Sequence, residues 1–141
     1  MERTLFIIKP DAVKRNVVGK ILEMVEDEEF KIVQLKMLRI DIKTASNFYA
    51  IHKEKSFFNE LINFITSSNC VISVLEKENG VSELRKLVGE TDPLKSPPGT
   101  IRRYYGTDIQ KNAVHASDSI ENAEREISIL FGDKETYSFL E

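Results

Sequence analysis

The sequence has very little cysteine: Cys70 is the one cysteine among 141 residues. A single cysteine excludes an internal disulfide framework and a cysteine-based zinc site. The two histidines, His52 and His115, lie too far apart in the sequence to suggest a metal motif. A chain of this length buries enough surface to fold without such a staple, and we interpret Cys70 as an inert buried thiol.

Long hydrophobic runs are also missing. No apolar stretch approaches the roughly 20 residues that a membrane-spanning helix needs. The apolar run over residues 5–8 is too short for a signal peptide. We therefore expect a cytoplasmic location and no membrane association.

A strong charge of either sign is absent, but the charge is unevenly placed. The 20 basic and 23 acidic residues give a net charge of −3, which argues against a general nucleic-acid-binding protein. Residues 95–111 nevertheless hold four basic residues and one acidic residue, a net charge of +3. A local basic stretch in an acidic protein indicates a compact anionic ligand rather than a long polyanion.

No repeat, low-complexity tract or linker divides the chain, so we expect a single domain over residues 1–141. Apolar runs and alternation predict strands over 4–9, 33–37, 71–75 and 112–117. In the second strand, Val33, Leu35 and Met37 alternate with polar residues, so one face is expected to be buried. A bulge or the end of this strand is expected after Met37.

Apolar residues at helical spacing predict helices over 18–25, 45–52, 58–65, 81–88 and 120–130, the last with Ile120 inward. The expected caps are Thr44, Ser56 and Asp118 at N-termini, and Gly89 at a C-terminus. Residues 89–112 hold three of the four prolines and three of the six glycines. This composition predicts a long structureless loop, and such loops are usually functional.

The order of these elements favours an α+β, ferredoxin-like βαββαβ fold. In this arrangement a four-stranded antiparallel sheet has a helical pair inserted between its second and third strands. A long loop precedes the last strand, and a helix ends the chain. A doubly wound parallel sheet is the alternative, because the connections also permit it.

The usual phosphate-binding motifs are absent. The sequence has no G-x-x-x-x-G-K-[ST] loop and no G-x-G-x-x-G, and it lacks the kinase triplets H-R-D and D-F-G. Any nucleotide phosphate must therefore be held by side chains.

His115 is the most informative candidate, because it lies among small and apolar residues on a short predicted strand. A neutral imidazole is a good nucleophile near pH 7. Glu126 follows on the last predicted helix, where its carboxylate could return to fix the tautomer and stabilise a histidine cation. The alternatives are a satisfied core histidine and a solvated glutamate.

Basic residues surround this segment in the sequence. Arg102 and Arg103 follow a Pro-Gly turn, and Arg85 lies on the helix that leads into the loop. Guanidinium groups suit phosphate oxygens, although one of Arg102 and Arg103 is expected to be solvated. Thr91 can add a hydroxyl group. Lys9 closes the first strand and either reaches a ligand there or snorkels into water.

The aromatic residues allow two interpretations. Phe57 and Phe58 open a predicted helix, where one can face the core and the other a pocket. Tyr49 lies on the apolar stripe of its helix, and we interpret His52 on the same stripe as structural.

Several segments, taken together, resemble nucleoside diphosphate kinase. The most specific are NAVHASDS over 112–119 and the Lys-Pro-Asp triplet over 9–11. The other matching segments are residues 2–5, 18–21, 48–49, 57–58, 89–93 and 98–102. They run colinearly over nearly the whole chain.

The resemblance implies a ping-pong phosphotransferase with the ferredoxin-like fold. A nucleoside triphosphate such as ATP would give its γ-phosphate to His115, and the phosphohistidine would give it to a nucleoside diphosphate. Mg²⁺ would arrive on the phosphates. The family forms homo-oligomers, tetramers or hexamers built from dimers, and this short C-terminus leaves the choice open.

The resemblance also assigns roles to residues. Lys9 and Asn112 are similar to the sugar contacts, and Phe57 to the face on which the base stacks. The residues similar to the phosphate contacts are Arg85, Thr91 and Arg102. Those similar to the neighbours of the catalytic histidine are Tyr49, Ser117 and Glu126. A stacked base with few polar contacts would be recognised broadly.

This sequence departs from the family pattern at two places. Lys55-Ser56 stands where the family commonly has Arg-Pro, and Asn69-Cys70 falls within a segment that is usually Ser-Gly-Pro-Val. Two other functions are also considered. A regulatory module of the same fold would have no reason to keep this set of residues. An RNA-binding sheet would want aromatic residues that the strand over 71–75 lacks.

Overall fold

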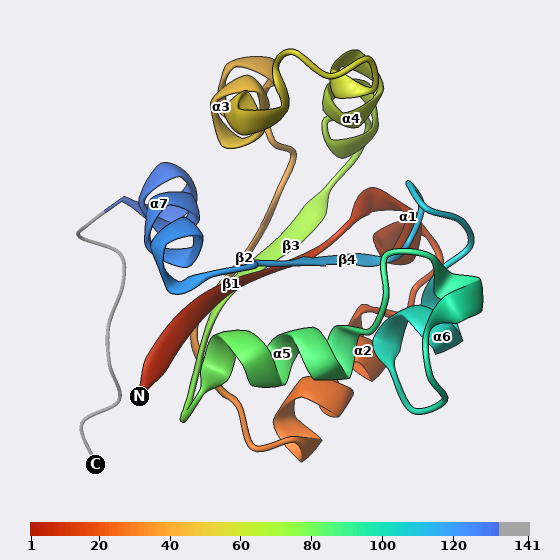
Figure 1. The fold of residues 1–141 in the computed structure, drawn as a ribbon, viewed down its shortest axis with the longest axis vertical. Coiled ribbons are helices and arrows are strands. Elements are labelled where there is room, and N and C mark those ends of the chain that lie inside the picture. The colour runs from red at the N-terminus through yellow and green to blue at the C-terminus, as the bar shows by residue number, and fades with distance from the viewer. Residues whose placement is uncertain (133–141) are drawn as a thin grey trace.

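The computed structural model describes residues 1–132 and shows one four-stranded sheet (Figure 1). The strands are β1 (Glu2–Ile8), β2 (Lys31–Leu38), β3 (Cys70–Lys77) and β4 (Val114–Ala116). They lie in the order β2-β3-β1-β4, and every neighbouring pair is antiparallel. This order confirms the ferredoxin-like fold and excludes the parallel alternative. The predicted single domain, residues 1–141, includes residues 133–141, which lie outside the described residues.

Helices cover both faces of the sheet (Figure 1). The helices are α1 (Pro10–Lys14), α2 (Val18–Asp27), α3 (Ile42–Phe48), α4 (Phe58–Ile65), α5 (Gly80–Val88), α6 (Ile101–Tyr105) and α7 (Ile120–Phe131). Two short 3₁₀ helices, η1 (Ala50–His52) and η2 (Pro93–Lys95), complete the described elements. Figure 1 shows α3, α4 and α7 on one side of the sheet and α2 and α5 on the other. None of the helices in residues 1–132 is long and apolar enough to span a membrane.

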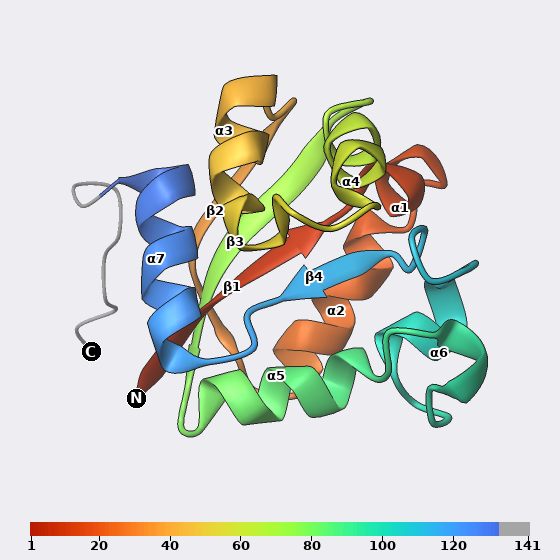
Figure 2. The ribbon, with the colours of Figure 1, turned by 45° about the horizontal axis from the view of Figure 1, so that its top comes forward.

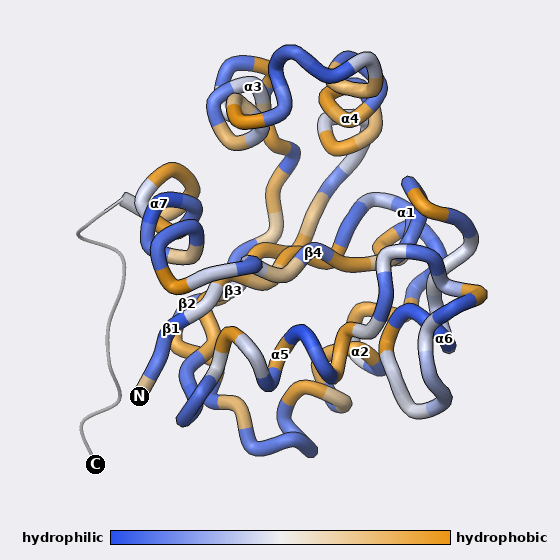
Figure 3. The backbone as a smooth tube through the Cα atoms, viewed as in Figure 1, coloured by the Kyte–Doolittle hydropathy of each residue, from blue (hydrophilic) through white to orange (hydrophobic). Residues whose placement is uncertain are grey.

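The core consists of two hydrophobic clusters separated by the sheet. Because successive strand residues point to opposite faces, β1 sends Phe6 and Ile8 into the cluster under α2 and α5. Leu5 and Ile7 pack in the other cluster, against α3, α4 and α7. All four side chains are fully buried, and hydrophobic residues colour much of the central sheet in Figure 3.

The expected burial along β2 is wrong. Leu35 and Met37 are 48% and 55% exposed, because β2 is the edge strand and the helices pack mainly on the strands inside it. The strand ends at Leu38, as expected, and a bulge lies between Ile32 and Gln34. The strand therefore presents an apolar edge that no described residue covers.

Three expected N-caps are also wrong. The carboxylate of Asp41 accepts from the backbone N–H of Thr44 at 2.7 Å and caps α3. Helix α4 has no side-chain cap, so Ser56 does not fill that role. Ser119 caps α7 by accepting from the backbone N–H of Asn122 at 3.0 Å, one residue after the expected Asp118.

Two further corrections concern helix ends and the long loop. Ile120, expected inward, is 51% exposed at the start of α7. Residues 89–112 are not structureless, since they contain η2 and α6. A Pro at the start of η2 and a Thr100 hydroxyl that caps α6 explain these short helices. Gly89, with φ +92°, ends α5 as expected.

Candidate active site

His115 and Ser117 share one carboxylate partner. They lie two residues apart at β4, so both side chains point to the face that α7 covers. After β4 the chain returns over the sheet as α7, which stands beside α3 in Figure 2 and contacts β1. This return brings Glu126 Oε1 to 3.0 Å from His115 Nε2 and to 2.7 Å from Ser117 Oγ. The Ser117 hydroxyl also accepts from the backbone N–H of Leu5 at 3.2 Å.

These contacts select one tautomer of the neutral imidazole. The carboxylate accepts the proton that Nε2 carries, so the lone pair of the neutral ring lies on Nδ1. Within residues 1–132, Nδ1 makes no hydrogen bond. The Phe48 ring packs edge-on against the imidazole, with 5.1 Å between ring centroids, and the side chain of His115 is 20% exposed. One ring nitrogen is therefore held and the other is open to a cavity.

This cavity has a volume of about 180 Å³ and joins most of the candidate residues. The candidates that line it are Tyr49, Arg85, Thr91, Arg102, His115 and Glu126. It also takes in Phe48, Ile51, His52, Ala116, Asp118 and Asn122. Lys9, Phe57, Asn112 and Ser117 lie outside its lining.

Two arginines give the cavity a cationic wall. Arg102 on α6 is buried and donates to the carbonyls of Val114 at 2.9 Å and Gly89 at 3.2 Å. Burial, reinforced by nearby Arg85, lowers the pKa of Arg102 to about 10. Arg85 donates to the carbonyl of Ala116 at 3.4 Å. Because both cations line the cavity into which His115 opens, the wall suits an anion such as a phosphate.

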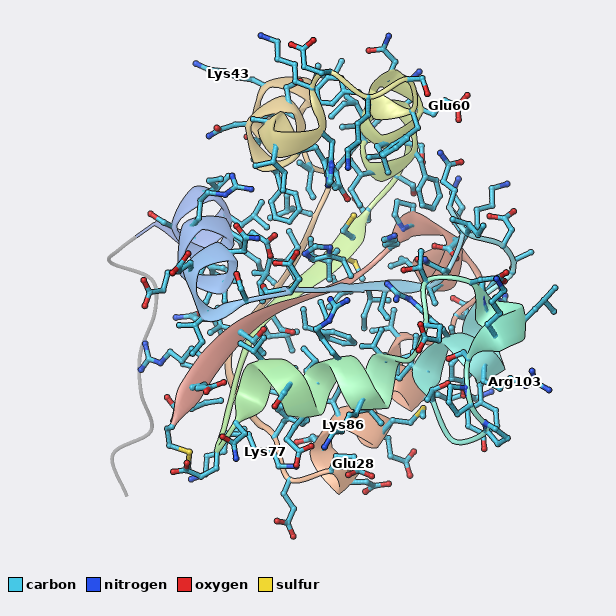
Figure 4. The ribbon with its side chains drawn as sticks, viewed as in Figure 1. Glu28, Lys43, Glu60, Lys77, Lys86 and Arg103 are labelled. Atoms are coloured by element: carbon cyan, nitrogen blue, oxygen red, sulfur yellow. The ribbon has the colours of Figure 1, made fainter. Side chains whose placement is uncertain are left out.

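Arg103 lies elsewhere. Its side chain points outward from α6 (Figure 4) and, among residues 1–132, donates only to the carbonyl of Leu94, at 3.4 Å, in an exposed contact. It takes no part in the cavity lining.

Lys9 and Asn112 form a buried pair beside the cavity. The Lys9 ammonium donates to Asn112 Oδ1 at 2.9 Å, and the Asn112 amide donates to the carbonyls of Thr91 and Ile109. Burial, and then the charge of Arg102, lowers the pKa of Lys9 to about 8. Thr91 links this pair to the cavity, because it belongs to the lining.

The two aromatic candidates, Tyr49 and Phe57, differ in burial and in their place relative to the cavity. Tyr49 is buried against Phe48, and burial raises the pKa of its hydroxyl. Phe57 is 42% exposed, outside the cavity, and its ring lies 5.9 Å from that of His52. The exposed ring is therefore available for stacking next to the cavity.

Three polar residues of the lining, His52, Asp118 and Asn122, were not among the candidates. His52 was interpreted as structural, but it lines the cavity, and its Nδ1 is buried with no hydrogen-bond partner among the described residues. Asp118 accepts from the Asn122 amide at 2.6 Å, and this bond lowers the pKa of its carboxyl group. Asp118 could have been found from the sequence, because it directly follows the predicted strand that carries His115. No comparable sequence pattern predicts the short 3₁₀ helix that places His52 in the lining.

Comparison with known proteins identifies the family. The family model described as nucleoside diphosphate kinase matches residues 2–136. The chain is 50% identical to the nucleoside diphosphate kinase of Campylobacter hominis over 135 residues, which cover 96% of this chain and 98% of that protein. It is 48% identical to the enzyme of Nitratiruptor sp., with the same coverage of both chains.

Solved structures agree with these sequence matches. The crystal structure of the Aquifex aeolicus nucleoside diphosphate kinase superposes with a TM-score of 0.93 at 44% identity, covering 96% of this chain and 99% of that one. A Halobacterium salinarum nucleoside diphosphate kinase in complex with CDP superposes with a TM-score of 0.94 at 39% identity, covering 99% and 93%. The chain is therefore an enzyme of the nucleoside diphosphate kinase family.

Proposed function

We propose that the protein transfers the γ-phosphate of a nucleoside triphosphate, typically ATP, to a nucleoside diphosphate through a phosphohistidine on His115. The observation that carries this proposal is the asymmetry of the imidazole. Its Nε2 is held by Glu126 at 3.0 Å, while Nδ1 has no partner among residues 1–132 and opens to a cavity with two arginines. Such transfers would maintain the pools of NTPs and dNTPs.

The proposed reaction has two halves that use one site. Nδ1 attacks the γ-phosphorus, the bond to the oxygen that bridges the β- and γ-phosphates breaks, and the nucleoside diphosphate leaves. A second diphosphate then attacks the phosphorus with a terminal oxygen of its β-phosphate, and the P–N bond breaks. Because the two nucleotides occupy the same cavity in turn, the kinetics are ping-pong.

Charge and position supply the catalysis. Phosphoryl transfer depends mainly on positioning and on neutralising the phosphate oxygens, which we assign to Arg85, Arg102 and the Thr91 hydroxyl. The Glu126 carboxylate stabilises the cation that forms when Nδ1 is phosphorylated, much as a triad aspartate stabilises an imidazolium. Ser117 donates to that carboxylate at 2.7 Å and holds it in place. Tyr49 lines the wall beside the histidine.

The remaining candidates would hold the nucleoside. We assign the sugar hydroxyls to Lys9 and Asn112, which already bond to each other at 2.9 Å. The base would stack on Phe57, whose ring is 42% exposed. The CDP in the Halobacterium salinarum relative supports a nucleoside diphosphate as ligand, and stacking on a ring accepts any base.

In this proposal Mg²⁺ would enter the site bound to the phosphates of the nucleotide. Residues 1–132 contain no group of three or more His, Cys, Asp or Glu side chains that could hold a metal ion. Of the two carboxylates in the cavity lining, Glu126 is already engaged with His115 and Ser117. Bound Mg²⁺ would neutralise phosphate charge.

We also propose a homo-oligomer, tetramer or hexamer. The exposed apolar edge of β2, with Leu35 and Met37, supports an interface with a second copy, because monomers rarely leave apolar edge strands uncovered. Sedimentation velocity will measure the mass, and a monomer at micromolar concentration would refute this part. Cytoplasmic location and the absence of stable nucleic-acid binding stay predictions.

The test of the phosphohistidine is a labelling and chase experiment. Wild-type protein mixed with γ-labelled ATP and Mg²⁺ should acquire acid-labile phosphate, and unlabelled GDP should remove that phosphate as GTP. The variant His115→Ala should acquire none. No label on the wild type, or equal label on the variant, would contradict the proposal.

A further inference from the structure

A strained turn separates two of the proposed site residues. Ala113 lies between Asn112 and the β4 strand that carries His115, and its φ is +73°. The backbone N–H of Val114 donates to the carbonyl of Asn112 at 2.9 Å, which closes a three-residue turn centred on Ala113. Turns of this kind with a positive φ are rare and strained in residues other than glycine.

The N-terminal segment holds this turn from two sides. Asp11 Oδ2 accepts from the backbone N–H of Ala113 at 3.1 Å, and the carbonyl of Ala113 accepts from the backbone N–H of Lys9 at 2.8 Å. Ala113 itself is fully buried. Residues 9 and 11 thus fix both polar groups of a residue that is distant in the sequence.

The Asp11 carboxylate is partly buried and has few hydrogen-bond partners. Its other oxygen, Oδ1, is buried and has no hydrogen-bond partner among the described residues. The bond to Ala113 is therefore the single side-chain hydrogen bond that the structure shows for Asp11. A buried polar atom without a hydrogen-bond partner is costly, and local violations of this sort concentrate at functional sites.

We propose that Asp11 is a positioning residue of this phosphotransfer site, whose carboxylate keeps Ala113 in the left-handed turn that places Asn112 and His115. The proposal rests on the proposed function, because it assigns the reaction to His115. Asp11 does not line the cavity, so it acts through the backbone. The competing explanation is that Asp11 only complements the N-terminus of the short helix α1, to which it belongs.

Glycine separates these explanations, because it adopts a positive φ without the penalty that alanine carries. If Asp11 acts by holding the turn, a glycine at position 113 should make the carboxylate dispensable. If Asp11 acts on α1 through its charge, the glycine should make no difference. The comparison requires four proteins: wild type, Asp11→Ala, Ala113→Gly and the double variant.

The readout is the single-turnover rate at which saturating ATP and Mg²⁺ phosphorylate the protein, with circular dichroism as the check on folding. Asp11→Ala should lower this rate by about 10- to 100-fold, since small displacements at a reacting centre have effects of this size. The double variant should recover to within about 3-fold of Ala113→Gly. Asp11→Asn keeps an amide oxygen that can accept from Ala113, so its rate should stay close to that of wild type.

Asp41→Ala is the matched control, because Asp41 also accepts from a backbone N–H but caps the exposed start of α3. It should phosphorylate at the wild-type rate. If Asp11→Ala fails to fold, a folded and active double variant supports the proposal, and an unfolded or inactive one overturns it.

If Asp11→Ala folds, two results would overturn the proposal: a wild-type rate for Asp11→Ala, or a double variant as slow as Asp11→Ala. The wild-type protein distinguishes this failure from a failure of the proposed function. If the wild type acquires no phosphate, the phosphohistidine is wrong. If it does but the glycine brings no recovery, only the role of Asp11 is wrong.

Discussion

Replacing Glu126 by glutamine should slow the phosphorylation of His115 strongly without removing the side chain. Glu126 is 5% exposed, and its carboxylate accepts from Nε2 at 3.0 Å. Glutamine keeps an oxygen in this place but loses the charge that faces the histidine cation. A hydrogen bond between charged groups exceeds a neutral one by about 1–2 kcal/mol, and attraction at about 4 Å with an effective dielectric constant near 20 reaches about 4 kcal/mol. A loss of about 2–4 kcal/mol corresponds to a roughly 30- to 1000-fold slower reaction.

Rapid-quench measurement with γ-labelled ATP will give this rate directly. Glu124→Gln is the matched control, because Glu124 lies on the same helix with an exposed side chain. Its rate should stay within about twofold of wild type, as for most surface substitutions. If Glu126→Gln reacts as fast as Glu124→Gln, the carboxylate does not stabilise the cation.

Three further predictions test the site and the fold. Arg102→Ala should lower kcat/KM by about 10²-fold, in the range seen when one charge-stabilising donor is removed. Arg103→Ala should change kcat/KM by less than about twofold, because the Arg103 side chain is outside the cavity. Equal losses for the two variants in steady-state assays would contradict this assignment. Burial lowers the pKa of Lys9 from 10.5 to about 8, so the unfolded chain binds more protons between these values. Titration of Lys9 should therefore raise the free energy of unfolding by on the order of 3 kcal/mol between pH 8 and 10.5, and denaturant titrations should show this contribution as a growing difference between wild type and Lys9→Met. Gly89→Ala should lower stability by about 2 kcal/mol or more, since its φ is +92° and a Cβ would overlap neighbouring side chains; the control Gly19→Ala, with open space around it, should be neutral or stabilising in the same melts.

The sequence predicts the strands and the chemistry best where the signal is local. The apolar run before Pro10 identifies β1, and the segment around His115 identifies the nucleophile candidate. The antiparallel return that brings Glu126 to His115 also follows from a strand followed at once by an amphipathic helix.

Features that depend on tertiary packing cannot be predicted from local sequence patterns. The alternation at Leu35 and Met37 looks like a half-buried strand, but burial depends on whether a helix covers that part of the sheet, and β2 lies at the edge. Likewise, prolines and glycines over 89–112 suggest a structureless loop although capping at Thr100 supports a short helix there. His52 lines the cavity because of a 3₁₀ turn, and such a short turn produces no periodic pattern in the sequence.

The position of the phosphate on the imidazole tests the account most directly. Alkaline hydrolysis of the labelled phosphoenzyme, followed by chromatography of the two phosphohistidine isomers, distinguishes Nδ1 from Nε2. Because Glu126 holds Nε2 and Nδ1 carries the free lone pair, the account predicts phosphate on Nδ1 of His115. Phosphate on Nε2, or on a residue other than His115, would contradict it.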